Sequence, residues 1–434
     1  MVWLPGLCYN LHMLDLNYVR QNLEKVAEKV RSKGVDFDAR VFNALDENRR
    51  RLITEAEGLK NRRKSLSKEI GLRRRDGLDS SDLEKQSADL GREVQELDEE
   101  LAQAESEFND LWLNIPNLPD DSVPAGRDAR DNRVVREWGE KPEFAFTPRP
   151  HWELGGEKGR LDFPRAAKIA GARFAVYFAN LARLERVLIH FMLDMHTREH
   201  GYIEVLPPFL ANADSLTGTG NLPKFKQDLF KVEDHNLYLI PTAEVPLTNL
   251  HRDETLSIDD LSLKYVAYTP CFRSEAGSYG KDVRGIIRNH QFNKVELLKF
   301  TAPENSAAEL EALTNDAERI LQALNLHYRV VLLCSGDMSF SSAKTYDLEV
   351  WMPARNDYME ISSCSNFHDF QSRRAHIRLR GPGGRKTHPH TLNGSGLAIG
   401  RTVAAIMENY QTASGGVDIP AALEQAFPGE SRLV

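Results

Sequence analysis

The chain has 434 residues, with 56 Lys and Arg against 64 Asp and Glu, and a formal net charge of -8. This length allows two or three domains with ample core, and the acidic balance excludes a protein coated in positive charge, so any contact with nucleic acid must be local. No apolar run approaches the ~18 to 20 residues that span a bilayer, and the four cysteines form no C-x-x-C pair that would indicate a disulfide framework or a cysteine-rich zinc site.

The first residues, MVWLPGLCYNLH, lack the charged start and the long apolar centre of a secretion signal. They also contain no Arg, which an organellar leader would carry. We therefore expect a cytoplasmic protein that does not enter a membrane. Its cysteines, Cys8, Cys271, Cys334 and Cys364, are expected to be reduced thiols.

Apolar residues recur in heptad register in two stretches of the amino-terminal quarter. The first stretch consists of Phe42, Leu45, Leu52, Ala56, Leu59, Leu66 and Ile70, and the second of Leu83, Leu90, Val94, Leu97, Leu101, Ala104, Phe108 and Leu111. Between them, GLRRRDGLDSS supplies glycines and helix-capping residues. The pattern predicts an antiparallel coiled-coil hairpin over residues 37–113, with arms of about 32 residues that reach roughly 48 Å.

Charge is segregated along this predicted hairpin. Residues 49–75 contain eleven Lys and Arg against three acids, whereas residues 76–110 contain thirteen acids and two bases. The opposite charges can simply pair across the hairpin and keep it soluble. A basic rod on an acidic body also suits a nucleic-acid phosphate backbone. The basic residues crowd one helix and the tip, and the candidates for such a contact are Arg49, Arg50, Arg51, Arg62, Arg63, Lys64, Arg73, Arg74 and Arg75.

A segment rich in Pro, Gly and Asp follows over residues 113–149 and indicates a linker. We place one domain at residues 1–125 and a second at residues 126–434. In the second domain, runs such as YRVVLL, TYDLEVWM and YMEISS have strand composition with few crossover helices between them. This pattern predicts an α+β fold with a mostly antiparallel sheet flanked by helices, rather than a doubly wound parallel sheet.

An amphipathic helix is predicted from Phe178 to His200, followed by a strand in GYIEVLPPFL. Pro207 and Pro208 stop this strand, because proline cannot donate a backbone hydrogen bond. The segment therefore indicates an interface or a sheet edge.

Two further strand-like runs, KYVAYTPCF and FNKVELLKF, flank a loop from Gly277 to Gly285 and predict a long antiparallel hairpin. Arg273 ends the first run, Glu275 follows it on the same face, and Arg288-x-x-x-Phe292 leads into the second. A guanidinium can bind two phosphate oxygens, a carboxylate can accept from the adenine amine, and an aromatic ring can stack on a base for ~1 to 3 kcal/mol. Each residue alone fits a surface pair or a core Phe, but together they predict a nucleotide site.

A glycine-rich junction near the carboxyl terminus, HTLNGSGLAIGRTVAAIMENYQ, predicts a short strand that runs into an apolar helix. Gly394, Gly396 and Gly400 allow close backbone packing, and the helix start, which carries Arg401, favours an anionic ligand. A G-x-x-x-x-G-K-[ST] loop is missing from the sequence, which excludes a P-loop ATPase. The histidines of NFHDF and KTHPHT, which are His368, His388 and His390, lack paired ligands and are expected to be structural or on the surface.

The three segments, in this order, resemble the signature motifs of class II aminoacyl-tRNA synthetases. Within that class the chain is similar to seryl-tRNA synthetases of the bacterial type, on the strings LIPTAEVPLTN, CFRSEAGSYGKD, YMEISSCSNFHDFQSRR and TLNGSGLAIGR. The resemblance covers nearly the whole chain from Met13 onward. Because this family begins at strings like MLDLNYVR, the residues before Met13 are expected to be an extension or a misassigned start.

The resemblance implies that the chain activates L-serine with ATP and transfers it to tRNA(Ser), and as a plausible second substrate to tRNA(Sec). Arg273 and Arg401 would be catalytic, and Mg²⁺ would be held by Glu360 and Ser363 between the phosphates. The residues implied to bind ATP are Arg273, Ser274, Glu275, Arg288, Phe292, Glu360, Ile361, Ser362, Ser363 and Arg401. The residues implied to bind serine are Thr242, Ala243, Glu244, Glu296 and Ser395.

The resemblance also implies a homodimer whose helical hairpin holds the long variable arm of the tRNA, commonly across the dimer. Two alternatives stay open at this point. One is a relative that activates a small amino acid for a carrier protein or a metabolite, although such relatives tend to lack the hairpin. The other is a catalytically silent RNA-binding or coiled-coil scaffold, which the presence of the site residues disfavours.

Overall fold

The computed structural model describes residues 14–276 and 284–434 of the chain. These residues form two compact units. The arm unit comprises Asp15–Arg31 and Val35–Ile115, and the body unit comprises Ser32–Gly34 and Pro116–Val434. The last residue of the arm unit is Ile115. The division into domains at residues 1–125 and 126–434 stays a prediction.

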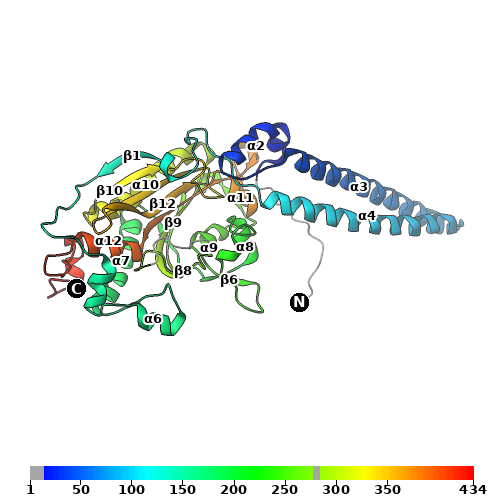
Figure 1. Cartoon of the computed structure of the whole chain (residues 1–434). Coiled ribbons are helices and arrows are strands. Elements are labelled where there is room, and N and C mark those ends of the chain that lie inside the picture. The colour runs from blue at the N-terminus through cyan, green and yellow to red at the C-terminus, as the bar shows by residue number, and fades with distance from the viewer. Residues whose placement is uncertain (1–13, 277–283) are drawn as a thin grey trace. The chain divides into compact units, whose positions relative to one another are not determined.

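The arm unit is dominated by two long helices, α3 (Ala39–Arg75) and α4 (Ser81–Leu113), which lie side by side as an antiparallel hairpin (Figure 1). The side chain of Asp38 caps α3 by accepting from the backbone N–H groups at its start. The base of the hairpin is aromatic, because the Phe42 ring lies 5.8 Å from Phe108 and 5.7 Å from Trp112. Heptad positions such as Phe42, Leu52 and Val94 are buried, so the coiled-coil prediction is confirmed. Two short helices, α1 (Leu16–Gln21) and α2 (Leu23–Ser32), precede the hairpin.

The body unit is built on an eight-stranded sheet with the order β1-β10-β11-β12-β15-β9-β8-β4. Neighbouring strands are antiparallel except β4 and β8, which are parallel, so the predicted mostly antiparallel α+β fold is confirmed. The strands in sheet order are β1 (Arg133–Trp138), β10 (Tyr328–Leu332), β11 (Lys344–Met352), β12 (Asp357–Asn366), β15 (His390–Ala398), β9 (Gln291–Thr301), β8 (Leu263–Phe272) and β4 (Ile203–Glu204).

Three helices pack on one face of this sheet: α7 (Ala179–Arg198), α10 (Ser306–Ala323) and α12 (Ile399–Asn409) (Figure 1). Their apolar faces and the sheet form the main hydrophobic core. Gly394 in β15 faces α10, and a Cβ at this position would overlap Leu313 and Cys364. The glycine therefore lets the helix approach the strand closely.

The remaining α-helices and strands of the body unit are α5 (His151–Glu157), β2 (Leu161–Asp162), α6 (Phe163–Ala170), β3 (Val176–Tyr177), β5 (Leu210–Asn212), α8 (Ala213–Gly218), β6 (Leu237–Leu239), α9 (Glu244–Asn249), β7 (Thr255–Ser257), α11 (Phe370–Arg374), β13 (Arg378–Arg380) and β14 (Lys386–Thr387).

The strand predicted in GYIEVLPPFL ends before Pro207, as expected, and spans only Ile203–Glu204. One predicted boundary needs correction. The strand expected to be short before α12 is instead nine residues long and takes in Gly394 and Gly396. Glycine is tolerated here because the strand is covered by closely packed helices.

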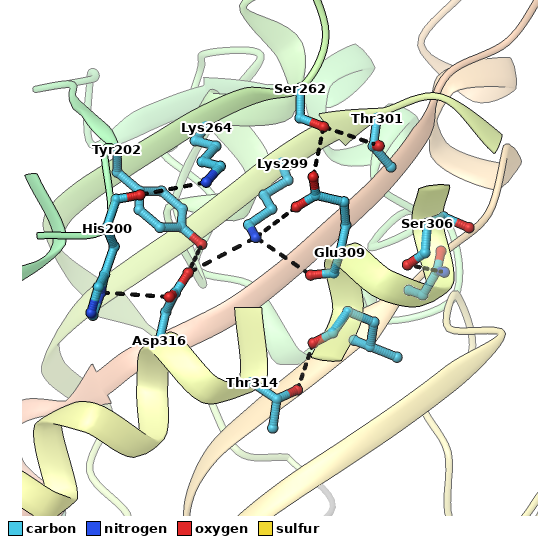
Figure 2. Close-up of polar contacts among 12 residues, drawn as sticks. His200, Tyr202, Ser262, Lys264, Lys299, Thr301, Ser306, Glu309, Thr314 and Asp316 are labelled. Atoms are coloured by element: carbon cyan, nitrogen blue, oxygen red, sulfur yellow. Dashed lines mark hydrogen bonds and ion pairs between the residues drawn. The ribbon is translucent and has the colours of Figure 1, made fainter. Parts of the chain in front are cut away.

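A buried polar cluster lies between β9 and α10 on the helix-covered face of the sheet (Figure 2). Lys299 is fully buried, and its Nζ lies 2.8 Å from Glu309 Oε2 and 3.9 Å from Asp316 Oδ2. Tyr202 donates a hydrogen bond of 2.8 Å to Asp316, and Ser262 donates one of 2.9 Å to Glu309. Burial lowers the pKa of Lys299. The cluster thus links α10 to the sheet through the buried Lys299 ammonium. Its ion pairs with Glu309 and Asp316 offset the free-energy cost of removing this charge from water.

In the residues that the structure describes, no helix is long and apolar enough to cross a membrane. The cysteines among them, Cys271, Cys334 and Cys364, are buried and form no disulfide with one another.

Candidate active site

A cavity of about 820 Å³ opens on the face of the sheet opposite the three helices and is lined by residues from β9, β12, β15, the start of α12 and Arg273, which directly follows β8. Side chains alternate between the faces of a strand, so Glu296 of β9 lines the cavity while Lys299 points to the helices. The predicted site residues that line it are Thr242, Glu244, Arg273, Glu275, Arg288, Phe292, Glu296, Glu360, Ile361, Ser363, Ser395 and Arg401. Segments far apart in the sequence are therefore brought to one place.

Three predicted residues do not line the cavity. Ala243 is fully buried beneath it. Ser274 bonds the backbone of Gln227 through its hydroxyl, and the hydroxyl of Ser362 donates a hydrogen bond of 2.6 Å to the Ser395 carbonyl. These side chains support the cavity wall, and only their backbone groups remain for a ligand.

Three arginines enter the cavity from different elements. Arg273 follows the end of β8, and its guanidinium carbon lies 5.3 Å from the centre of the Phe292 ring. Arg288 Nε lies 3.4 Å from Glu275 Oε2. Arg401, in the first turn of α12, places Nη1 3.2 Å from Glu360 Oε1. Three guanidinium groups around one cavity can neutralise a polyphosphate.

The described ends of the loop between β8 and β9 line one rim of the cavity. Residues 277–283 of the predicted loop Gly277 to Gly285 lie outside the described residues. Glu275, just before them, has a positive φ of 51°, a strained conformation for a residue with a side chain. Its carboxylate and the Phe292 ring both line the cavity, so a carboxylate acceptor and a stacking surface are available together.

The end of the cavity near β9 is rich in acids. Asn393 Nδ2 donates hydrogen bonds to Glu244 Oε2 (2.9 Å) and to Glu296 Oε1 (3.0 Å). Gln371 donates one of 2.6 Å to the other oxygen of Glu244. Desolvation, followed by repulsion from the Glu296 carboxylate, raises the pKa of Glu244 to about 7. Two acids held this closely can receive an ammonium group and a hydroxyl donor.

Lys294 was not among the predicted site residues, although it lies at the centre of this end. Its Nζ is 2.8 Å from Thr242 Oγ1 and forms an ion pair with Glu296. The alternation of FNKVEL could have identified it, because Lys294 and Glu296 are two apart and share one face of the strand. Asn393 and Gln371 were missed as well, and nothing in their local sequence distinguishes them from structural amides.

Glu360 and Ser363 on β12 provide a carboxylate and a hydroxyl at the arginine end of the cavity. Asp347 lies directly opposite Ser363 on β11, and its buried Oδ1 has no hydrogen-bond partner among the described residues. Burial and the neighbouring Glu360 raise the pKa of Asp347. In the described part of the chain, no cluster of three or more His, Cys, Asp or Glu could hold a metal. The donor set fits a hard cation that takes its other ligands from phosphates and water, as Mg²⁺ does.

The predicted structural histidines contact protein groups. His388 Nδ1 is 2.8 Å from the Ile377 carbonyl, and His390 Nδ1 is 2.9 Å from Ser306 Oγ. His368 Nε2 lies 3.5 Å from Asp120 Oδ2, and its ring stacks on His390 at 4.9 Å. None of the three is among the residues that line the cavity.

The arm unit carries the second candidate site. Arg62, Arg63 and Lys64 are exposed on α3 and form no ion pair with a described residue. The arginines of the tip are exposed but paired: Arg73 with Glu69 (3.4 Å), Arg74 with Glu84 (2.9 Å) and Arg75 with Asp76 (3.3 Å). Arg50, also exposed, pairs with Asp46 at 3.3 Å.

Arg49 differs from the other predicted RNA contacts. Its side chain is buried, its guanidinium carbon lies 4.8 Å from the centre of the Phe108 ring, and it lies 3.7 Å from Asp46. Arg49 therefore stabilises the base of the hairpin, and we leave it out of the proposed contacts with RNA. The sequence could not separate it from Arg50, because both lie in one run of arginines.

Two family models match the chain. The first, described as "tRNA synthetase class II core domain (G, H, P, S and T)", matches residues 225–410, and the second, "Seryl-tRNA synthetase N-terminal domain", matches residues 13–119. A serine–tRNA ligase of Syntrophobacter fumaroxidans is 60% identical over 422 residues, which cover 97% of this chain and 100% of the relative.

Solved structures agree with these matches. The seryl-tRNA synthetase of Pyrococcus horikoshii complexed with ATP has a TM-score of 0.87 and 34% identity, over 97% of this chain and 99% of that one. A cytoplasmic serine–tRNA ligase of Naegleria fowleri in complex with AMP has a TM-score of 0.82 and 27% identity, over 97% of each chain.

Proposed function

Because the chain belongs to the seryl-tRNA synthetase family and is a serine–tRNA ligase, we propose that its cavity activates L-serine with ATP and passes the seryl group to tRNA(Ser). The observation that carries the proposal is the convergence of Arg273, Arg401 and Glu296 on one cavity. In the first step the serine carboxylate attacks the α-phosphate in line and pyrophosphate leaves. The protein supplies positioning and charge neutralisation, and needs no covalent nucleophile.

ATP occupies the arginine end of the cavity in this proposal. Arg273 bridges the α-phosphate and the serine carboxylate, while Arg288 and Arg401 hold the outer phosphates. Phe292 stacks on adenine and Glu275 accepts from its amine. The backbone of Ser274, Ile361 and Ser362 completes this wall. The ion pairs that Arg288 and Arg401 form with Glu275 and Glu360 would rearrange when phosphates arrive.

Serine occupies the acidic end. Thr242 and Glu244 receive the ammonium, and Glu296 and Ser395 meet the hydroxyl, while the buried Ala243 packs behind Thr242 and Glu244. Bound alanine or glycine has no hydroxyl and would leave the buried Glu296 carboxylate without this hydrogen bond. The lost hydrogen bond supports discrimination against both amino acids. Threonine is refused by the walls around the hydroxyl.

We further propose that Glu360 and Ser363 hold Mg²⁺. The carboxylate and hydroxyl suit a hard ion, and the buried Asp347 lies directly opposite Ser363 on β11. Bound Mg²⁺ would supply positive charge between the phosphates of ATP.

We propose that the helical hairpin of the arm unit contacts the long variable arm of the tRNA. The proposed residues are Arg50, Arg62, Arg63, Lys64, Arg73, Arg74 and Arg75. Because a phosphate backbone is read by charge and shape, a second serine-accepting tRNA, tRNA(Sec), is proposed as a further substrate. We propose the cytoplasm as the site of the reaction. The alternative acceptor, a carrier protein or a metabolite, gains no support from an arm unit of this kind.

A homodimer is the proposed assembly. The edge strand β4 and the segment after it expose Ile203 (58%), Leu206 (79%) and Leu210 (41%). Exposed apolar residues on a sheet edge are a liability in a monomer, and a second copy of the same surface would cover them with two-fold symmetry.

Pyrophosphate exchange with each of the twenty amino acids, with and without tRNA, tests the proposal. We expect exchange with serine alone to be strong and to need no tRNA. Exchange that favours another amino acid, or transfer of serine to a carrier protein but not to tRNA, would contradict it.

A further inference from the structure

A fully buried His–Glu pair lies behind the rim of the cavity. His151 is the first residue of α5, Glu408 lies near the end of α12, and both side chains are 0% exposed. His151 Nδ1 is 2.8 Å from Glu408 Oε1, and the backbone N–H of His151 donates to the same oxygen at 3.2 Å. The other carboxylate oxygen accepts from the backbone of Ala354 at 3.2 Å. Three donors around the carboxylate suit its ionised form.

The second ring nitrogen of His151 faces the loop between β8 and β9. The backbone N–H of Ile286 donates a hydrogen bond of 3.2 Å to Nε2. Because a backbone N–H can only donate, Nε2 must carry no proton, and the ring proton lies on Nδ1 against Glu408. Glu408 thereby selects the tautomer that can accept from Ile286.

The His151 imidazole packs tightly against the backbone at Gly285. Gly285 has a φ of +83°, and a Cβ there would overlap His151 Nε2. The next residues, Ile286, Ile287 and Arg288, all line the cavity. The carbonyl of Ile287 accepts a hydrogen bond of 3.2 Å from Arg401 Nε. Helix α12 thus holds the backbone before β9 at two points. Glu408 acts on Ile286 through His151, and Arg401 contacts the Ile287 carbonyl directly.

We propose that His151 and Glu408 are positioning residues for ATP: they fix the backbone at Ile286 so that Arg288 is held toward the phosphates. Neither side chain lines the cavity, so their effect passes through Ile286. The inference rests on the proposed role of Arg288. Misplacing a phosphate ligand weakens ATP binding and slows activation, whereas serine is held by other strands.

The test compares two variants of the full chain in which His151 is replaced by a residue with an amide side chain. In H151Q the Gln carbonyl reaches the position of Nε2 and can accept from Ile286, whereas in H151N the shorter amide can donate to Glu408 but cannot reach Ile286. For H151N we expect the KM for ATP in pyrophosphate exchange to rise about tenfold, as for one lost hydrogen bond, with the KM for serine changed less than about twofold. H151Q should recover most of the ATP affinity.

Hydrogen exchange provides a readout that does not depend on activity. The amide of Ile286 should exchange faster in H151N than in H151Q or the unchanged chain. Equal exchange in the two variants, or KM values for serine and ATP that rise together, would overturn the inference. If H151N does not fold, G285A serves instead, since its Cβ pushes the loop from the ring. A wild-type KM for ATP in G285A would also overturn it.

R288A separates this inference from the proposed function. If R288A leaves the KM for ATP unchanged, the role of Arg288 is wrong, while faster exchange at Ile286 in H151N would still establish the contact.

Discussion

Arg401 and Glu360 pair inside the cavity, with Nη1 3.2 Å from Oε1, although they are 41 positions apart in the chain. The Arg401 Nη1 also donates a hydrogen bond of 2.7 Å to the Glu360 carbonyl. The planar guanidinium of Arg401 therefore orients Glu360, the proposed Mg²⁺ ligand. The same contact holds Arg401 where a terminal phosphate would bind. Arg401 Nε donates a further hydrogen bond of 3.2 Å to the Ile287 carbonyl, and a single ammonium group cannot reproduce the contacts that Nε and Nη1 make from two different atoms.

We expect R401K to lower kcat/KM for ATP in pyrophosphate exchange by about 100-fold, because the fork geometry is lost although the charge is kept. R198K, on the exposed surface of α7, is the matched control and should keep wild-type kinetics. Full activity in R401K would show that only the charge matters at this position.

Glu296 should affect serine far more than ATP. Its replacement by Ala in E296A removes the proposed partner of the hydroxyl and leaves Lys294 without its ion pair. We expect the KM for serine to rise at least about 30-fold and the KM for ATP to change less than about threefold. The exposed Glu304 supplies the control variant E304A. A selectivity for serine over alanine that survives in E296A would remove Glu296 from the serine pocket.

Serine binding should depend on pH through Glu244, whose pKa is raised to about 7 by desolvation and by the Glu296 carboxylate. Below this pH the carboxyl group is neutral and cannot balance the serine ammonium, so the KM for serine should fall as the pH rises toward 8. In E244Q the KM should be high and flat with pH.

The stability of the fold should change in the opposite direction. The folded state keeps a proton on Glu244 that the unfolded chain releases above its ordinary pKa of 4.5. The free energy of unfolding should therefore fall as the pH rises from about 4.5 to about 7, and this loss should be smaller in E244Q. Denaturant titrations at several pH values measure it.

The arm should contribute to tRNA charging and not to serine activation. In the double variant R62E/K64E, two exposed bases of α3 become acids, which repel phosphates without disturbing the hairpin core. We expect the KM for tRNA(Ser) to rise at least about tenfold at physiological salt, while pyrophosphate exchange without tRNA stays unchanged. K25E, on α2, is the control. Equal loss of both activities would contradict the division of labour.

The sequence predicted the parts of the site that lie close together in the chain. Arg273, Glu275 and Phe292 share one hairpin, so alternation and strand ends fixed their common face. The sheet class followed from strand-like runs without crossover helices. The pair of His151 and Glu408 could not be predicted, because residues 257 positions apart meet only through the packing of two helices. The burial of Arg49 likewise depends on Phe108 from the opposite helix.

Replacing Lys299, in the buried cluster between β9 and α10, should strongly lower the free energy of unfolding, although this residue lies away from the proposed active site. In K299A the carboxylates of Glu309 and Asp316 lose the fully buried ammonium that neutralises them (Figure 2). Breaking one partner of a buried ion pair costs about 3 to 5 kcal/mol, because the remaining charges stay desolvated. K25A, at an exposed site, should change stability by less than about 0.5 kcal/mol.

Urea titration measures the two free energies of unfolding, and pyrophosphate exchange below the transition measures function. The serine and ATP KM values of folded K299A should stay near those of the unchanged chain, because Lys299 points away from the cavity that Glu296 lines. A double variant, K299M/E309L, tests the cause: if the loss in K299A comes from unpaired charge, replacing both partners by apolar residues should recover part of it. If K299M/E309L is no more stable than K299A, packing around the lysine stem, and not its charge, holds α10 to the sheet.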